Sequence, residues 1–480
     1  MRGVRGCFGF IAGFQLLSMG VALSQVQPNY LAPLPQQFTP RPAVIPAAPV
    51  AVPSPAQATA PAQVFAPRVA DPNPAQPALS EATPGGATGA AATPVKKPKP
   101  KVAAAPPKPG ETALPTDPAP TFAPDTYSFT LVAADRYTNI VLAGGWPEVV
   151  NGLKPGSRGP DVATLRQRLS IEGDLDTGFS FGEAWDENLT TAVKRFQRRM
   201  GLRQTAIVTG ATLKAMNVPA DVRARQLGAS AQRIESINFP FGERYVVVNI
   251  PSAVVEAVEG DRVVHRYVAV VGDVKHRSPE VVTRIQAVNL NPTWTLPTSI
   301  IKNEIIPKMR KDPGYLGRTK IRMLDSSGQE VNPASIDWST NRAVNYTLRQ
   351  DSGNANALGN IRINMPNSDS VYMHDTPSKR FFGSDYRFLS HGCVRVAGVF
   401  DFAQWLLEGT NGSWDKAAML AKVATKERTD IRLARPVPVI WTYMTGWVSP
   451  DGIVHFRNDV YDYDTQSAMQ ARAERAIARR

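Results

Sequence analysis

The stretch Ser390-His391-Gly392-Cys393-Val394-Arg395 narrows the choice of fold more than any other part of this 480-residue chain. It holds one of only two cysteines, and the other, Cys7, lies in an apolar N-terminal segment typical of an export signal. A lone thiol in an exported protein has no partner for a structural disulfide. Its polar and glycine neighbours indicate a reactive nucleophile, with an inert buried cysteine as the alternative.

A second run, Val-Tyr-Met-His-Asp-Thr-Pro, occupies residues 371–377 upstream of this thiol. Alternation along a strand places Tyr372 and His374 on one face and their neighbours in the core. A histidine beside a thiol can manage the proton in nucleophilic catalysis. We therefore expect His374 and Cys393 to act together, with a merely structural histidine as the alternative.

The surrounding sequence predicts a β-rich domain, because β-branched segments alternate with turn residues. The first three segments indicate an antiparallel meander with a turn at Gly260. Residues 298–344, rich in Lys and Arg, interrupt the strands and are expected to form a lid over the cleft or a surface decoration. The predicted strands cover residues 244–250, 254–258, 263–271, 345–349, 359–364 and 370–374.

The N-terminal part of the chain indicates export. Residues 1–24 combine basic residues, an apolar stretch and small residues before the expected cleavage site, with an uncleaved membrane tether as the alternative. Residues 25–125 are rich in Pro and Ala and are expected to form a disordered linker. Losing residues 1–24 removes two arginines and no acids, so the net charge falls from +13 to +11. This excess suits a polyanionic wall, and without a nucleic-acid-binding motif we expect no nucleic-acid partner.

Residues 126–240 predict an α-helical scaffold with an inserted module at about 144–217. Apolar residues recur at helical spacing in this module. The runs Leu153-Lys154-Pro155-Gly156 and Ala192-Val193-Lys194-Arg195-Phe196-Gln197 resemble the three-helix peptidoglycan-binding domain. The resemblance implies glycan binding, with a spacer role left open.

The two catalytic runs resemble the signature of the YkuD-type L,D-transpeptidase domain. The likeness extends over about residues 244–464 and includes Asn291-Pro292-Thr293-Trp294 and Asn356-Ala357-Leu358-Gly359. The insertion, the upstream module, Asp375 after the histidine and Arg395 after the cysteine resemble the large YcbB-like subclass.

The resemblance implies that Cys393 attacks the carbonyl between the third and fourth residues of a peptidoglycan stem. The terminal D-alanine leaves, a thioester remains, and an amine of a neighbouring stem then attacks it. His374 would move the protons, and the backbone carbonyl of Asp375 would orient its ring. Backbone N–H groups around Gly392 and Cys393 are the natural oxyanion donors, and a helix after the cysteine would favour the thiolate.

Four further residues are expected at the substrate side of the site. Arg395 suits either a substrate carboxylate or a structural ion pair. His391 is expected to support the loop, with proton transfer as the alternative, and Ser390 to stabilise the loop. Tyr372 shares the face of His374.

The expected fold is α+β and multidomain: a β-rich catalytic domain over residues 241–465, a helical lid insertion, the helical scaffold with its three-helix module, and a charged tail over 466–480. A zinc site formed by His374, His391 and Cys393 would lack a fourth ligand, and no nucleotide-binding fingerprint occurs, so we expect no metal and no cofactor.

The function expected is a periplasmic, wall-associated transpeptidase that acts as a monomer on stem peptides and glycan. Two alternatives stay open. The same site would serve an L,D-carboxypeptidase or a wall-protein anchoring enzyme if the acceptor were water or a protein amine. A non-catalytic peptidoglycan-binding protein is the third hypothesis, but it would not need the cysteine and histidine.

Overall fold

The computed structural model describes residues 110–466. The expected signal peptide, the linker up to residue 109 and the tail from residue 467 lie outside the described residues. In the described range, no helix combines the length and the apolar character that a bilayer span needs. The α+β class with a β-rich domain and a helical region is confirmed.

Residues 110–125 differ from the expected linker, because they lie against the folded body. The N–H and the hydroxyl of Thr112 both donate to the carboxylate of Asp385 at 2.8 Å. The N–H of Thr121 donates to the carboxylate of Glu256 at 2.8 Å. The expected linker was therefore too long at its C-terminal end. Its partners are distant in sequence, and composition alone does not reveal them.

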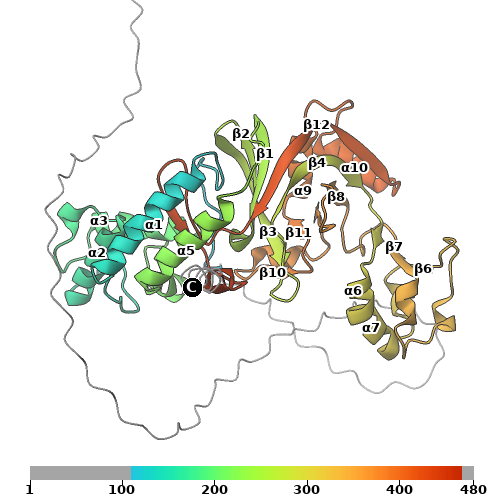
Figure 1. The fold of residues 1–480 in the computed structure, drawn as a ribbon, viewed down its shortest axis with the longest axis horizontal. Coiled ribbons are helices and arrows are strands. Elements are labelled where there is room, and N and C mark those ends of the chain that lie inside the picture. Colours follow the sequence, from blue (N-terminus) through green and yellow to red (C-terminus); the bar gives the residue numbers. More distant parts are fainter. Residues whose placement is uncertain (1–109, 467–480) are drawn as a thin grey trace, which may run out of the picture. The chain divides into compact units, whose positions relative to one another are not determined.

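The helical region follows the sequence periodicity. Its helices are α1 (Thr126–Leu142), α2 (Pro160–Glu172), α3 (Glu187–Arg199), α4 (Gly210–Met216) and α5 (Ala220–Ile234). Asp186 caps α3 by accepting the N–H of Leu189 at 2.8 Å, and Gly201 after the helix adopts a left-handed φ of 69°. α1 packs along α5, and the two run side by side in Figure 1.

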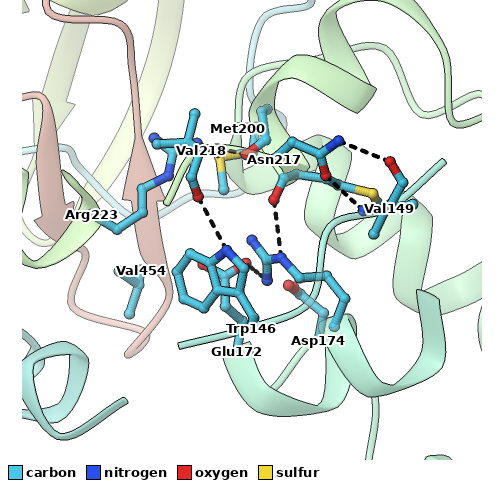
Figure 2. Close-up of polar contacts among 12 residues, drawn as sticks. Trp146, Val149, Glu172, Asp174, Met200, Asn217, Val218, Arg223 and Val454 are labelled. Atoms are coloured by element: carbon cyan, nitrogen blue, oxygen red, sulfur yellow. Dashed lines mark hydrogen bonds and ion pairs between the residues drawn. The ribbon is translucent and has the colours of Figure 1, made fainter. Parts of the chain in front are cut away.

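Buried charges join the helices α2 and α3 of the module. Arg199 pairs with Glu172 at 2.6 Å and with Asp174 at 2.5 Å, and Arg168 pairs with Glu172 at 2.7 Å. The Arg168 guanidinium lies 3.9 Å from the centre of the Trp146 ring. Trp146, Glu172 and Asp174 gather at this junction in Figure 2. Because these charged groups are shielded from water, the cost of burying each of them is offset only by its ion-pair partners.

The main sheet combines strands from the whole C-terminal half. Its strands are β1 (Arg244–Asn249), β2 (Val254–Glu259), β3 (Arg262–Gly272), β4 (Val281–Leu290), β8 (Ile361–Asn364), β9 (Met373–His374), β10 (Phe388–Ser390), β11 (Val394–Val396) and β12 (Thr429–Thr442). They run in the order β10-β3-β11-β9-β8-β4-β12-β1-β2, and β2 also pairs with β3, which closes the sheet on itself. The expected meander of β1, β2 and β3, with its turn at Gly260, is confirmed.

The core of this domain lies between the sheet and two helices, α9 (Val399–Leu406) and α10 (Lys416–Ala424). Phe402 on α9 is fully buried and stacks on Trp405. A short hairpin of β13 (Gly446–Val448) and β14 (Val454–Phe456) joins the helical region, where Phe456 meets Tyr137 edge to face. The two regions therefore share contacts as well as a chain connection.

The insertion is a small unit with its own sheet and core. Its strands are β5 (Trp294–Thr295), β6 (Ile321–Leu324) and β7 (Thr347–Gln350), and its helices are α6 (Thr298–Ile300), a π-helical turn (Ile301–Ile305), α7 (Ile306–Lys311) and α8 (Tyr315–Arg318). β7 pairs with β5 and β6 rather than with the main sheet, and α6, α7, β6 and β7 group together in Figure 1. The sequence grouped the strand at 345–349 with the later catalytic strands. That grouping was wrong, because β7 completes the insertion's own core with Leu348.

Candidate active site

The loop that carries the thiol is fixed by two serines. Ser390, at the end of β10, donates its hydroxyl to the carbonyl of Cys393 at 2.5 Å. Ser278, which precedes β4, donates its hydroxyl to the carbonyl of Gly392 at 2.7 Å. Gly392 has a φ of +106°, a conformation that side chains disfavour. These contacts hold Cys393 at the start of β11 in one backbone geometry.

His374 ends β9 on the face predicted for it. Met373 is fully buried in the core, whereas the ring of His374 meets the Tyr372 ring edge to face at 5.8 Å between centroids, so the predicted alternation is confirmed. The Nδ1 of His374 is hydrogen-bonded to the carbonyl oxygen of Asp375. Because a carbonyl only accepts, Nδ1 carries the proton in this contact. The neutral ring then keeps a free lone pair on Nε2.

The side chain of Asp375 holds the strand end rather than the imidazole. Its carboxylate accepts the N–H of Asn360 at 3.0 Å and pairs with Lys379. A Cβ at Gly359 would collide with this carboxylate, and Gly359 also has a φ of +58°. The glycine of the 356–359 run is thus explained by the close approach of Asp375.

Tyr372 lies between the insertion and the thiol. Its phenol lies close enough to the side chains of Trp294 and Cys393 for both to influence the phenol pKa, which burial raises above its usual value. Asn356 anchors the nearby loop by donating to the carbonyls of Pro292 at 3.1 Å and Asp351 at 2.9 Å. The two runs at 291–294 and 356–359 are therefore structural neighbours that position the phenol.

The thiol and the imidazole are both neutral at rest. Burial raises the pKa of Cys393 to about 11, although the backbone N–H of Tyr372 and the charges of Arg395 and Arg362 act in the opposite direction. Burial lowers the pKa of His374 to about 3, helped by the positive charge of Arg395. At pH 7 the sulfur therefore holds its proton, and the ring is free to accept one.

The helix expected after the cysteine is present, but its predicted effect on the thiol was wrong. α9 begins at Val399 after the cap Gly398, beyond the whole of β11. The influence of a helix N-terminus falls off within its first turn, so it does not offset the burial of the sulfur. The resting group is the thiol, not the thiolate.

Residues 243–423 match the family model described as the L,D-transpeptidase catalytic domain, YkuD. The chain carries a YkuD-type L,D-transpeptidase domain. Residues 158–216 of the helical region match a second model, described as "Putative peptidoglycan binding domain".

A curated protein of Haemophilus influenzae, named "Putative L,D-transpeptidase", is 36% identical to this chain over 244 residues. The alignment covers 50% of this chain and 48% of that protein, so the chain spans about half the length of the curated relative it matches. An L,D-transpeptidase structure from Mycobacterium smegmatis aligns with a TM-score of 0.21 at 15% identity, covering 42% of this chain and 58% of that one. An L,D-transpeptidase structure from Stackebrandtia nassauensis aligns with a TM-score of 0.24 at 12% identity, covering 62% of this chain and 96% of that one.

Within this transpeptidase domain, His391 points away from the thiol chemistry and toward the insertion. Its Nε2 pairs with the carboxylate of Glu304 at 2.5 Å, and its ring lies 4.6 Å from that of His276. The hydrogen bond from His391 lowers the pKa of Glu304 to about 2. Lys308 on α7 also pairs with Glu304 at 3.1 Å. The contact joins the catalytic loop to the insertion.

Arg395 lies opposite His374 in the sheet register and has no ion-pair partner in residues 110–466. Its Nε is buried without a hydrogen bond, and burial lowers the pKa of the guanidinium. Of the two readings left open by the sequence, the structural ion pair therefore finds no support among the described residues.

Sequence reasoning missed Ser278, Glu304 and Arg362 as members of this transpeptidase site. Ser278 is a lone serine in a loop, and Glu304 is one acid in a charged insertion, so neither carries a local signal. Arg362 lies between the core residues Ile361 and Ile363 on an alternating strand, and only its register with His374 indicates its place in the site. A hollow of about 330 Å³ lined by Trp414 and other residues contains none of the expected site residues.

Proposed function

We propose that this protein is a cysteine-dependent L,D-transpeptidase that joins peptidoglycan stems. It would cleave the terminal D-alanine of a tetrapeptide stem through a thioester on Cys393. It would then transfer the acyl group to an amine of another stem. The H. influenzae relative and the YkuD match over residues 243–423 support this reaction class.

The observation that carries the proposal is geometric: β9 pairs with β11, which brings the loop that holds Cys393 beside His374, and the Nδ1 of His374 is hydrogen-bonded to the Asp375 carbonyl. A base must hold a free lone pair at the pH of the reaction, and a pKa of about 3 keeps the His374 ring neutral. The Asp375 carbonyl fixes the proton on Nδ1, which directs Nε2 to the chemistry. An inert structural cysteine would need neither an oriented imidazole nor a loop held by two serines.

The first half-reaction forms the thioester. His374 Nε2 takes the thiol proton as the sulfur of Cys393 bonds to the stem carbonyl carbon, and the carbonyl electrons move to its oxygen. The Cys393 N–H has no acceptor among residues 110–466 and is the natural donor to this oxyanion, whereas the Gly392 N–H already donates to Ser390 Oγ at 3.3 Å. The carbon–nitrogen bond then breaks, and the imidazolium returns its proton to the departing D-alanine amine.

The second half-reaction reverses these roles. An acceptor amine attacks the thioester carbonyl and gives its proton to His374, after which the sulfur leaves and recovers a proton. The low pKa of His374 helps here, because a weakly basic ring returns its proton readily. No metal or cofactor is needed for either half.

The remaining assignments concern location and binding. We place the protein in the periplasm, with the module that matches the peptidoglycan-binding family holding it on the wall. Arg395 would bind a carboxylate of the stem, and Tyr372 would line the site beside the thiol. The insertion, Asp375 and Arg395 support assignment to the YcbB-like subclass.

The proposal is tested by incubating the purified protein with disaccharide-tetrapeptides and identifying the products by mass spectrometry. We expect free D-alanine and a dimer linked between diamino acids, and both should disappear in Cys393→Ala. A tripeptide product in place of the dimer would point to water as the acceptor. A folded wild-type protein that releases no D-alanine would contradict the proposal.

A further inference from the structure

Polar side chains form a row across the main sheet, through the catalytic histidine. Register pairs Asp430 with Asn289, Asn289 with Arg362, Arg362 with His374, and His374 with Arg395. Directly paired residues on neighbouring strands project from the same face of a sheet. Arg362 and Arg395 therefore lie on either side of His374, each one strand away.

The guanidinium of Arg362 is held in place but not neutralised. It lies 5.1 Å from the centre of the Tyr372 ring, and its Nη2 donates to Asn364 Oδ1 at 2.9 Å. Its Nε is buried without a hydrogen bond. No carboxylate pairs with Arg362 anywhere in residues 110–466. The guanidinium of Arg362 is thus half-buried, fixed in orientation and without a carboxylate partner in the described part of the chain, and such a group is well placed to bind an anionic group of a ligand.

The acidic residues close to this row already form hydrogen bonds or ion pairs with other residues. Asp430 accepts from Asn289 at 2.8 Å and pairs with Arg428 at 2.8 Å. Asp375 pairs with Lys379. The thiol of Cys393 lies within the field of Arg362, whose charge acts to lower the thiol pKa. The charge of Arg362 therefore acts on the thiol, and it also helps to lower the pKa of Asp430, with which Arg362 forms no ion pair.

We propose that Arg362 is a second carboxylate-binding residue of this site, opposite Arg395 across His374. This inference rests on the proposed function. The ligand is a carboxylate of the stem peptide, whose sources are the terminal D-alanine, the diamino acid side chain and the D-glutamate. Two arginines on opposite sides of the base would hold two carboxylates and so fix the peptide along the row with its scissile carbonyl at Cys393.

A structural role for Arg362 predicts a different behaviour. If Arg362 served only to orient Tyr372 or to stabilise the thiolate, its loss would affect every substrate equally. Loss of the Arg362 charge, which acts to lower the thiol pKa, would slow alkylation of Cys393 by a small neutral reagent under either role, so the alkylation rate does not distinguish the two. A carboxylate contact instead produces a loss that depends on whether the substrate carries that carboxylate.

The test combines Arg362→Gln and Arg362→Lys with four stem tetrapeptides: the unmodified peptide and three in which one carboxylate is replaced by an amide. We expect Arg362→Gln to lower kcat/KM for the unmodified peptide about 10- to 100-fold, mainly through KM, with partial recovery in Arg362→Lys. For one of the amidated peptides the loss should shrink to within about twofold, because the contact is already absent. That peptide identifies the carboxylate.

Arg284→Gln is the matched control, since Arg284 is an exposed arginine on the neighbouring strand β4, and it should leave kcat/KM unchanged. Iodoacetamide alkylation of Cys393 and the melting temperature verify that the Arg362 variants keep a folded, reactive site. Equal losses on all four peptides, or no loss on any of them, would overturn the inference. If the wild-type enzyme turned over none of the peptides, the proposed function would fail instead.

Discussion

At the scale of single residues, the distinguishing feature is that the proposed nucleophile, Cys393, and the proposed base, His374, are both uncharged at rest. Preformed thiolate–imidazolium pairs need the thiol pKa to lie below that of the imidazole. Here burial sets the two values in the opposite order, at about 11 for Cys393 and about 3 for His374. The thiolate is therefore a small fraction of the resting Cys393 at pH 7.

This order of pKa values predicts how Cys393 reacts with neutral iodoacetamide, which consumes only the thiolate. A raised pKa means that the thiolate fraction is small at pH 7 and grows as the pH rises toward about 11. We expect the alkylation rate to increase about tenfold per pH unit between pH 6 and 9 without reaching a plateau. A plateau below pH 7 would instead reveal a preformed thiolate.

Ser278 provides a second prediction at this scale. Its hydroxyl donates to the Gly392 carbonyl and accepts the N–H of Gly272 at 2.9 Å, so Ser278→Ala leaves two buried groups unpaired. We expect kcat to fall about tenfold because the thiol loop loses its fixed position. Ser335→Ala, which removes a similar hydroxyl contact in the exposed part of the insertion, is the control. Equal kcat values for the two variants would contradict this positioning role.

The sequence could predict the reactive residues but not the residues that position them. Cys393 and His374 can be recognised as candidates from their residue types and from the residues next to them in the sequence. Ser278 contacts Gly392 across 114 positions of chain, and no local pattern encodes such a contact. Arg362 likewise acquires meaning only from strand register, which the sequence does not specify by itself.

At the scale of elements, the insertion is a unit with its own core, and its Glu304 contacts His391 of the loop that holds Cys393. Its core includes Ile305, Met309 and Leu348, and its own sheet closes around β7. The periodicity of the helices and of the meander was predictable, because it is local. The sheet to which β7 belongs was not predictable, because a strand of four residues fits either sheet until its partners are known.

We expect the contact between Glu304 and His391 to hold the insertion over the site. In Glu304→Gln a neutral amide replaces the carboxylate, which weakens the hydrogen bond with His391, so the insertion should open more often. The KM for stem peptides should rise several-fold, while alkylation of Cys393 by iodoacetamide should become faster. Glu330→Gln, at an exposed acid of the same insertion, should change neither quantity. If the two variants had the same KM and the same alkylation rate, the contact between Glu304 and His391 would not hold the insertion over the site.

At the scale of the whole molecule, a buried ion network ties the helical module to the rest of the described chain. Burial acts to raise the pKa of Glu172, but Arg199 and Arg168 outweigh it and hold that pKa below its usual value. Arg199 also lies near the C-terminal hairpin, where it donates to the carbonyl of Val454 at 3.4 Å. The network thus connects segments that are far apart in sequence.

Glu172→Gln should therefore be strongly destabilising. The substitution removes the carboxylate that pairs with the buried guanidinium groups of Arg168 and Arg199. We therefore expect the free energy of unfolding at pH 7 to fall by about 3–5 kcal/mol. Because the folded-state pKa is depressed, this stabilisation is present above the usual glutamate pKa and is lost as the pH falls toward the folded value. Urea unfolding of both proteins at several pH values measures it.

The control for this variant is Asp221→Asn, which breaks an exposed pair with Arg225 whose side chains are 60% and 41% exposed. Exposed pairs contribute about 0–1 kcal/mol, so this variant should unfold almost as the wild type does. If Glu172→Gln unfolded with the same free energy as Asp221→Asn, the network would not be a determinant of stability.

The central claim is that Cys393 carries the acyl group and that His374 moves its proton. Intact-protein mass spectrometry after acid quenching, followed by peptide mapping, tests it most directly. With a stem tetrapeptide, the wild-type protein should gain the mass of the substrate less D-alanine, on the peptide that contains Cys393. His374→Ala should form this adduct about 10²–10⁴-fold more slowly, and Cys393→Ala should form none. Release of D-alanine by Cys393→Ala at the wild-type rate would contradict the account.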